Sequence, residues 1–249
     1  MKHFIEEEDI DQLCAAAAHF IIKTAAKSIK KNGRFTFALS GGSTPKALFA
    51  LMALPHHATQ IDWKKTFVFW SDERKVPLND EDNNAKMAID ALLSKVSIPK
   101  KNIFRIASNL SAEKAAKKYE ENIRNFFGAS KPSMDICLLG LGDDGHTASL
   151  FPATTILQEK KALVSNVHVP KLDTERISFT IPMILSSRNI VFFLSGKGKA
   201  KIFNTVITGA YEPEQYPAQF IQGKSKSIFY FYDKAAGKYL KKSLQTKSA

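Results

Sequence analysis

The chain has 249 residues, of which 44% are hydrophobic and 24% charged, and its formal net charge is +12. This composition excludes a disordered, a collagen-like or a disulfide-stapled protein, and no apolar run reaches the roughly 18 residues that a membrane span needs. The acidic stretch Glu6–Asp9 is unlike a signal or transit peptide, so we expect a cytoplasmic protein without a membrane partner. Cys14 and Cys137 lie in apolar surroundings, where we expect reduced core residues.

Helical and strand-like patterns alternate along the chain. In order, they predict a helix at 8–31, strand 34–39, helix 45–54, strand 66–70, helix 84–93, strand 103–106, helix 111–127, strands 134–139, 162–168, 176–180 and 189–195, helix 197–208, strand 227–232 and helix 233–241. Continuous apolar strands that alternate with helices are typical of a parallel sheet covered on both faces. We therefore predict a single α/β domain over residues 1–249, with a mainly parallel, Rossmann-like sheet and a short basic tail at about 243–249.

Polar clusters directly follow three of the predicted strands, at residues 40–44, 71–74 and 140–146. In parallel sheets, ligands bind beyond the carboxyl ends of the strands. We therefore expect the three clusters to line one shared site.

The first cluster, at residues 40–45, joins a strand to a helix. Its glycines allow a sharp turn that exposes backbone N–H groups, and the following helix presents its positive N-terminal end. The Gly-Lys-Ser/Thr of a nucleotide-binding loop is missing. A plain turn before a helix has the same pattern, and the functional alternative is a phosphate cradle formed by Ser40, Gly41, Gly42, Ser43 and Thr44.

The second cluster contains Asp72, Glu73 and Arg74 directly after a buried strand. These charges form either an ion-pair corner of the fold or a charged wall of a cleft. The acidic loop beyond them, at residues 80–84, is expected to lie in solvent.

The third cluster, GLGDDGHTASLFP at residues 140–152, gives the strongest indication of chemistry. Histidine is readily tuned to take a proton near pH 7, so we predict that His146 is a general base, and Asp144 lies near enough in sequence to orient its ring. The histidines and cysteines lack the spacing of a zinc site, and Ser149 does not lie in a Gly-x-Ser-x-Gly elbow. We therefore expect neither a catalytic metal nor a serine hydrolase.

Two later basic residues, Arg176 and Lys199, are expected to reach the same edge of the sheet and to hold a phosphate group. For Lys199 alone, an ordinary surface lysine is an equal alternative. The positive charge is compatible with nucleic-acid binding or with steering of an anionic substrate. Only six of the basic residues are arginine, and no nucleic-acid-binding motif is present, so we favour a small anionic substrate and no nucleic-acid partner.

In their order and spacing, these motifs resemble the 6-phosphogluconolactonases. The resemblance rests on residues 40–45, 71–74, 140–152, 176–180 and 196–200, and on Tyr216-Pro217-Ala218 followed by a strand and 233–236. It covers about residues 8–241. The related glucosamine-6-phosphate deaminases continue the third motif with Asn-Glu-Pro, whereas this chain has Leu150 and Phe151 before Pro152. Departures from the lactonase pattern are Asn83 in place of serine, Ala153 in place of glycine, and Gln219.

The resemblance implies hydrolysis of 6-phospho-D-glucono-1,5-lactone to 6-phospho-D-gluconate, the second step of the oxidative pentose phosphate pathway, without cofactor or metal. His146 would be the general base, and Asp144 or Asp72 would support its charged form. Arg74 and nearby backbone N–H groups would stabilise the oxyanion. The resemblance implies a small-molecule substrate, and we expect a monomer or weak homo-oligomer. A deaminase-like sugar-phosphate isomerase remains the alternative.

Overall fold

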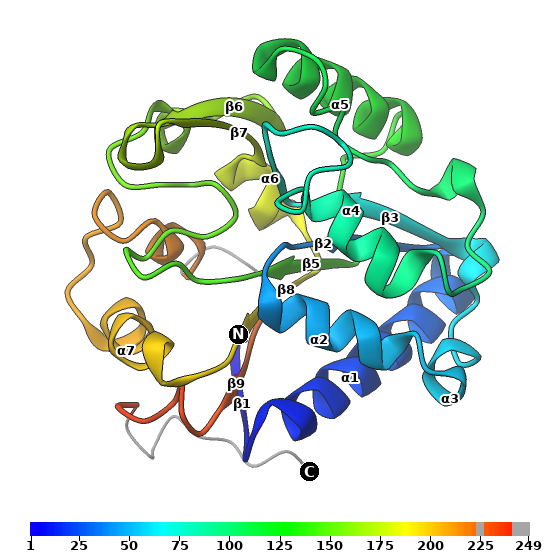
Figure 1. Ribbon diagram of the computed structural model, residues 1–249, viewed down its shortest axis with the longest axis horizontal. Coiled ribbons are helices and arrows are strands. Elements are labelled where there is room, and N and C mark those ends of the chain that lie inside the picture. Colours follow the sequence, from blue (N-terminus) through cyan, green and yellow to red (C-terminus); the bar gives the residue numbers. More distant parts are fainter. Residues whose placement is uncertain (223–226, 241–249) are drawn as a thin grey trace.

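The computed structural model describes residues 1–222 and 227–240, so the basic tail predicted at about 243–249 lies outside the described residues. A six-stranded parallel sheet forms its centre, in the order β1-β9-β8-β5-β2-β3 (Figure 1). The strands are β1 (Lys2–Glu7), β2 (Phe35–Leu39), β3 (Thr66–Trp70), β5 (Ile136–Leu139), β8 (Asn189–Leu194) and β9 (Ile228–Asp233).

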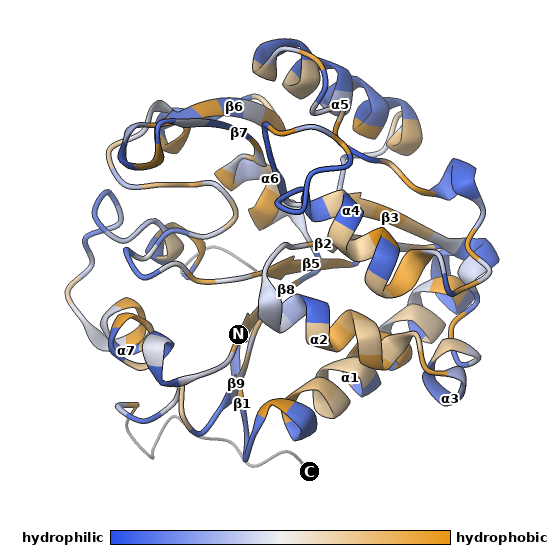
Figure 2. Ribbon diagram, viewed as in Figure 1, coloured by the Kyte–Doolittle hydropathy of each residue, from blue (hydrophilic) through white to orange (hydrophobic). Residues whose placement is uncertain are grey.

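The central strands are continuously apolar because both faces of the sheet are covered. Every residue of β2 and of β5 is buried, as are all residues of β8 after Asn189. Figure 2 shows the hydrophobic colour on these strands and a mixed pattern on the outer helices. This alternation of apolar strands and helices confirms the predicted α/β class and the mainly parallel sheet.

The helices are α1 (Ile10–Asn32), α2 (Ser43–Met52), α3 (Pro55–Ala58), α4 (Asn84–Ala88, continued by a π-helical turn, Ile89–Leu93), α5 (Ala112–Phe127), α6 (Ile181–Ser186) and α7 (Ala200–Thr208). Asp9 caps α1 by accepting from two backbone N–H groups, and Gly33 ends it in the left-handed conformation at φ 72°. Figure 1 shows α1 beside α2, with α5 on the far side of the molecule over β6 and β7.

A second, antiparallel sheet lies beside the first and was not foreseen. It has the order β4-β7-β6, from β4 (Asp72–Arg74), β7 (Thr174–Phe179) and β6 (Val164–Val169). Its register places Arg74 directly opposite Arg176. The charged cluster after β3 is therefore a short strand. Its pairing with β7 makes Arg74 and Arg176 cross-strand neighbours.

Several predicted elements need correction. Residues 103–106 do not form a strand, since Ile103 makes only an isolated parallel bridge to Val68. The helix predicted at 233–241 is wrong over the described residues, which complete β9 and then turn. Strand β1 was missed because its polar residues at the exposed sheet edge conceal the pattern.

Two expectations from the composition can be compared with the structure. Cys14 and Cys137 are buried and unbridged, as predicted, and burial raises the pKa of their thiols, to about 11 and about 12. Among the helices formed by residues 1–222 and 227–240, none combines the length and hydropathy required to cross a bilayer.

Candidate active site

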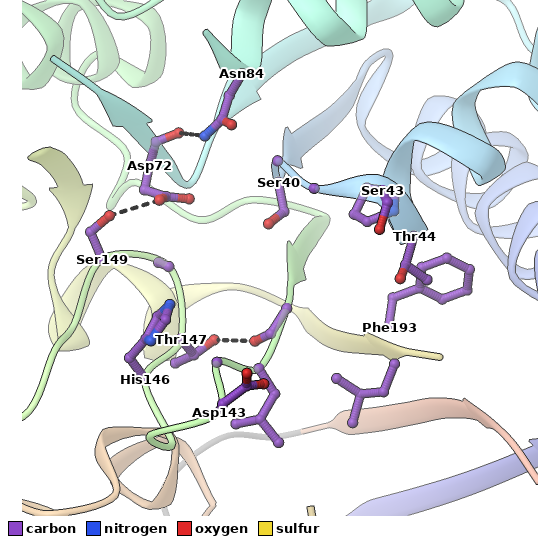
Figure 3. Close-up of a pocket in the computed structure, with 18 of the residues that line it drawn as sticks. Ser40, Ser43, Thr44, Asp72, Asn84, Asp143, His146, Thr147, Ser149 and Phe193 are labelled. Atoms are coloured by element: carbon purple, nitrogen blue, oxygen red, sulfur yellow. Dashed lines mark hydrogen bonds between the residues drawn. The ribbon is translucent and has the colours of Figure 1, made fainter. Parts of the chain in front are cut away.

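The three polar clusters meet in one cavity of about 400 Å³ at the carboxyl ends of β8, β5, β2 and β3 (Figure 3). Each of these strands delivers its next residues to the wall, as expected for a parallel sheet. All of the site residues predicted from the sequence line this cavity except Asp144, which lies behind His146; those in the wall are Ser40, Gly41, Gly42, Ser43, Thr44, Asp72, Arg74, His146, Arg176 and Lys199.

The first cluster forms the turn from β2 into α2. Gly42 has φ 105°, a conformation that favours glycine, and no side chain caps the helix at this end. The first N–H groups of a helix have no intrahelical acceptor, so they are available to a ligand in the cavity. At Gly41, a Cβ atom would lie 1.9 Å from Oδ1 of Asn84, so only glycine permits this close approach.

His146 is held in a tight loop after β5. Its Nδ1 lies 2.5 Å from Oδ1 of Asp144, which also accepts from the His146 backbone N–H at 3.2 Å. One face of the imidazole stacks on Phe151, with the ring centroids 3.9 Å apart. A Cβ atom at Gly142 would lie 2.0 Å from His146 Nδ1. The loop therefore fixes the imidazole from three sides.

The bond to His146 also holds the pKa of Asp144 well below its usual range, with smaller help from the charges of His146 and Lys171. Lys171 Nζ lies 3.6 Å from Asp144 Oδ2, and Leu172 beside it lines the cavity. Asp144 is thus an ionised partner for Nδ1, which leaves Nε2 as the ring nitrogen free for chemistry.

Asp72, the other candidate partner of His146, is engaged elsewhere. Its Oδ2 accepts from Ser149 Oγ at 2.7 Å and its Oδ1 from Ser71 Oγ at 3.3 Å. Figure 3 shows Asp72 and Ser149 facing each other above His146. Of the two aspartates that the sequence left open, Asp144 is the one that contacts the imidazole, and Asp72 forms part of the cavity wall.

The acidic loop, expected in solvent, contributes a buried residue to the site. Asn84 is 2% exposed, lines the cavity, and donates from Nδ2 to the backbone oxygen of Asp72 at 3.0 Å. Asn83 caps α4 by accepting from Lys86 N at 2.9 Å. The departure from serine at position 83 thus retains a polar contact, which here belongs to the helix cap.

Glu73 ties this loop to β4. Its buried carboxylate accepts from the backbone N–H groups of Arg74, Asn84 and Ala85 at 2.8–2.9 Å. Burial, only partly offset by these bonds, raises the pKa of Glu73 to about 7. Glu73 does not line the cavity; its carboxylate fixes the backbone that carries Arg74 and Asn84.

The two paired arginines differ in their contacts. Arg74 donates from Nη1 to the backbone oxygen of Asp82 at 2.6 Å. Arg176 has a buried Nε without a hydrogen-bond partner among the described residues. Burial lowers the pKa of Arg176, as does the charge of Arg74. A buried, unpartnered guanidinium N–H is costly, and the rest of this side chain lines the cavity.

Lys199 reaches the cavity from the short turn Lys197–Lys199 that follows β8. Its Nζ lies 2.7 Å from Oδ1 of Asp143, the residue beside Asp144. The ammonium is therefore already paired with a carboxylate.

Some cavity residues had no predicted role. Asn84 belongs to the loop expected in solvent, and Phe193 and Ser195 carry no sequence motif beyond their place at the end of β8. Ser149 and Phe151 belong to the third motif, so their place in the site could have been predicted from the sequence. Over residues 1–222 and 227–240, no group of three or more histidines, cysteines and carboxylates lies close enough to hold a metal ion.

The chain is similar to known proteins over most of its length. The model of the family described as "Glucosamine-6-phosphate isomerases/6-phosphogluconolactonase" matches residues 8–230. A protein named 6-phosphogluconolactonase from Nostoc sp. is 38% identical over 243 residues, covering 95% of this chain and 98% of its own length. A probable 6-phosphogluconolactonase 1 from Arabidopsis thaliana is 36% identical, covering 94% and 91%. The solved 6-phosphogluconolactonase from Trypanosoma cruzi superposes with a TM-score of 0.85 at 29% identity, covering 96% and 97%.

Proposed function

We propose that this chain, which belongs to the family of glucosamine-6-phosphate isomerases and 6-phosphogluconolactonases, hydrolyses 6-phospho-D-glucono-1,5-lactone to 6-phospho-D-gluconate. The observation that carries the proposal is the arrangement of one cavity. It has an oriented imidazole on one wall, and a helix N-terminus with two cationic side chains on the other walls. Its relatives are named for the same reaction.

In the proposed reaction, His146 acts as the general base. A water molecule attacks the lactone carbonyl carbon while its proton passes to Nε2 of His146. The new C–O bond places negative charge on the carbonyl oxygen, which Arg74 and backbone N–H groups of the cavity stabilise. When the ester bond to the ring oxygen breaks, His146 returns the proton to that oxygen. His146 is then neutral again, so the protein ends the cycle unchanged, and the acid formed releases its own proton to water at neutral pH.

Asp144 supports this cycle through Nδ1. Because it accepts the Nδ1 hydrogen, it keeps Nε2 free as the acceptor, and it stabilises the positive charge that the ring carries after the first proton transfer. A positioned general base typically contributes about 10²–10⁴ in rate. Asp72, through its bond to Ser149, shapes the wall on which the lactone lies.

We assign the phosphate group to the cradle of Ser40, Gly41, Gly42, Ser43 and Thr44, together with Arg176 and Lys199. The uncapped N-terminus of α2 supplies N–H donors. The guanidinium of Arg176, which lines the cavity without a carboxylate partner among the described residues, supplies a charged donor group. This assignment explains why so basic a cavity opens at the end of an otherwise apolar sheet.

A deaminase-like isomerase is the alternative within the same family. The residues before Pro152 argue against it, because Leu150 is buried and Phe151 packs on the His146 ring. An apolar ring at this position supplies no polar group for ring opening or amine chemistry. Ammonia release from glucosamine 6-phosphate would support the alternative.

We further propose that the reaction needs no metal and no cofactor, since lactone opening requires only a base and oxyanion donors. Incubation with EDTA should leave the activity intact, and added divalent ions should not raise it. Activity that is lost on chelation and restored by one particular ion would contradict this proposal. A cytoplasmic location and a monomeric or weakly oligomeric state stay predictions, and several relatives are named chloroplastic.

The decisive experiment is a coupled assay in which 6-phosphogluconolactone is generated in place and product formation is followed. We expect a rate far above spontaneous hydrolysis, in proportion to the protein added. A rate equal to the spontaneous one, together with ammonia release from glucosamine 6-phosphate, would show that the chain is a deaminase instead.

A further inference from the structure

Asp143 lies in the His146 motif but has no role in the proposed reaction. Its Oδ1 lies 2.7 Å from Lys199 Nζ, and both residues line the cavity. Its neighbour Asp144 faces His146 instead. Two consecutive carboxylates after β5 thus contact different residues of the site. Asp143 forms an ion pair with Lys199, which we assign to the phosphate group.

The side chains of Asp143 and Lys199 differ in their exposure to solvent. The side chain of Asp143 is 82% exposed, whereas that of Lys199 is 32% exposed. An ion pair with one strongly hydrated partner is weak. A phosphate dianion offers more charge and three acceptor oxygens, so it is the better partner for a partly covered ammonium.

Only one of the two cations that we assign to the phosphate group is paired with a carboxylate among the described residues: Lys199 is paired and Arg176 is not. Arg176 lines the same cavity and, unlike Lys199, makes no ion pair in the described part of the chain. At Lys199, an incoming phosphate oxygen competes with the carboxylate of Asp143 for the ammonium group. Of the two cations, Arg176 therefore has no carboxylate partner among the described residues, whereas Lys199 has one.

We propose that Asp143 is an exchangeable counter-ion of Lys199, which the phosphate of the substrate displaces and which returns when the product leaves. This inference rests on the proposed function, because it takes Lys199 as a phosphate ligand. Asp143 sets the affinity of the cavity for phosphate. It weakens the binding of substrate and product alike, and it keeps weaker anions of the cell from occupying Lys199.

The test measures binding of inorganic phosphate at pH 8 by calorimetry, which requires no turnover. For Asp143→Asn, we expect a dissociation constant roughly two- to fivefold lower than that of the wild type, in keeping with the modest strength of exposed ion pairs. Asp90→Asn is the matched control: Asp90 forms a similar 2.8 Å pair with Lys86 on α4, and its loss changes the net charge equally. Phosphate affinity should not change in this control.

A double-mutant cycle separates direct exchange from a general field effect. In a Lys199→Met background, Asp143→Asn should leave phosphate affinity unchanged. The inference is wrong if Asp143→Asn weakens phosphate binding or leaves it unaltered, or if it tightens binding equally without Lys199. Failure of the proposed function is distinguishable, because it appears as missing lactone turnover in the wild type, whatever the phosphate affinities.

Discussion

The two sides of the cavity are built in opposite ways. On the side that we propose for catalysis, the His146 imidazole is held in the absence of a ligand by Asp144, Phe151 and the close approach of Gly142. On the phosphate side, Arg176 Nε lacks a partner among the described residues, and Lys199 has only an exposed carboxylate. The proposed base is therefore preorganised, whereas the proposed phosphate ligands lack a strong partner within the described part of the protein.

The difference has a physical reason. A general base must lie in the right geometry at the moment of reaction, and misplacement by about 1 Å can cost on the order of 10² in rate. Groups that bind a phosphate must instead prefer the ligand to any protein partner. If this comparison is right, damage to one side should lower kcat, and damage to the other should raise KM.

The largest effect is expected for His146→Ala. Without the base, kcat should fall by about 10²-fold or more, because water is no longer deprotonated during attack. Steady-state kinetics with the phosphorylated lactone measure this directly. His19→Ala, on the exposed face of α1, serves as a control that should retain wild-type turnover. Nearly normal turnover of His146→Ala would move the base elsewhere, with Asp72 the next candidate.

A methyl group at position 142 should act through the same ring without removing it. In Gly142→Ala, the new Cβ would overlap His146 Nδ1, so the imidazole must shift and kcat should fall by up to about 10²-fold. Gly140→Ala is a strict control, because its Cβ meets nothing within 4 Å although Gly140 lines the same cavity. Equal losses in the two variants would show that the ring position is not what Gly142 protects.

Arg176→Ala should damage the other side. Loss of one charge-assisted contact costs about 1.5–3 kcal/mol, so KM for the phosphorylated lactone should rise by roughly ten- to hundredfold while kcat changes little. Kinetics with unphosphorylated gluconolactone, which lacks the anchored group, should be nearly unaffected. Arg105→Ala removes an exposed arginine as a control for charge. A similar loss on both lactones would assign Arg176 to the fold or the chemistry.

The smallest effect concerns stability in acid. The pKa of Asp144 is depressed from its ordinary value of 3.8, so its ionised form favours the folded state. This contribution is complete above pH 3.8 and is lost as the pH falls through the depressed folded value. Denaturant unfolding should therefore show Asp144→Asn less stable than the wild type at pH 7, with the gap narrowing below about pH 4. A gap that stays constant with pH would exclude this linkage.

The sequence was informative wherever a motif was short, contiguous and placed directly after an apolar strand. The turn around Gly41 and the loop of His146 both follow this rule, because parallel strands bring their carboxyl ends to one edge. Their glycines are also local requirements, as the close approaches to Asn84 and to the imidazole show.

The rest depended on pairings across long stretches of chain. Asn84 reaches the cavity because the buried Glu73 holds the start of α4, eleven residues further on. Arg74 meets Arg176 only because three residues pair with a distant antiparallel strand. The partner of Lys199 is 56 residues away. Such contacts have no periodic signature, and for the same reason the strand-like pattern at 103–106 does not reveal that this segment lacks a full strand partner.

The most direct test of the account is the affinity of His146→Ala for the product, 6-phospho-D-gluconate, measured by calorimetry beside its turnover. The account predicts a dissociation constant within about threefold of the wild-type value in a variant whose kcat has fallen by about 10²-fold or more, because the phosphate wall remains intact. A loss of product affinity as large as the loss of turnover would contradict it, since the two sides of the cavity would then not be separable.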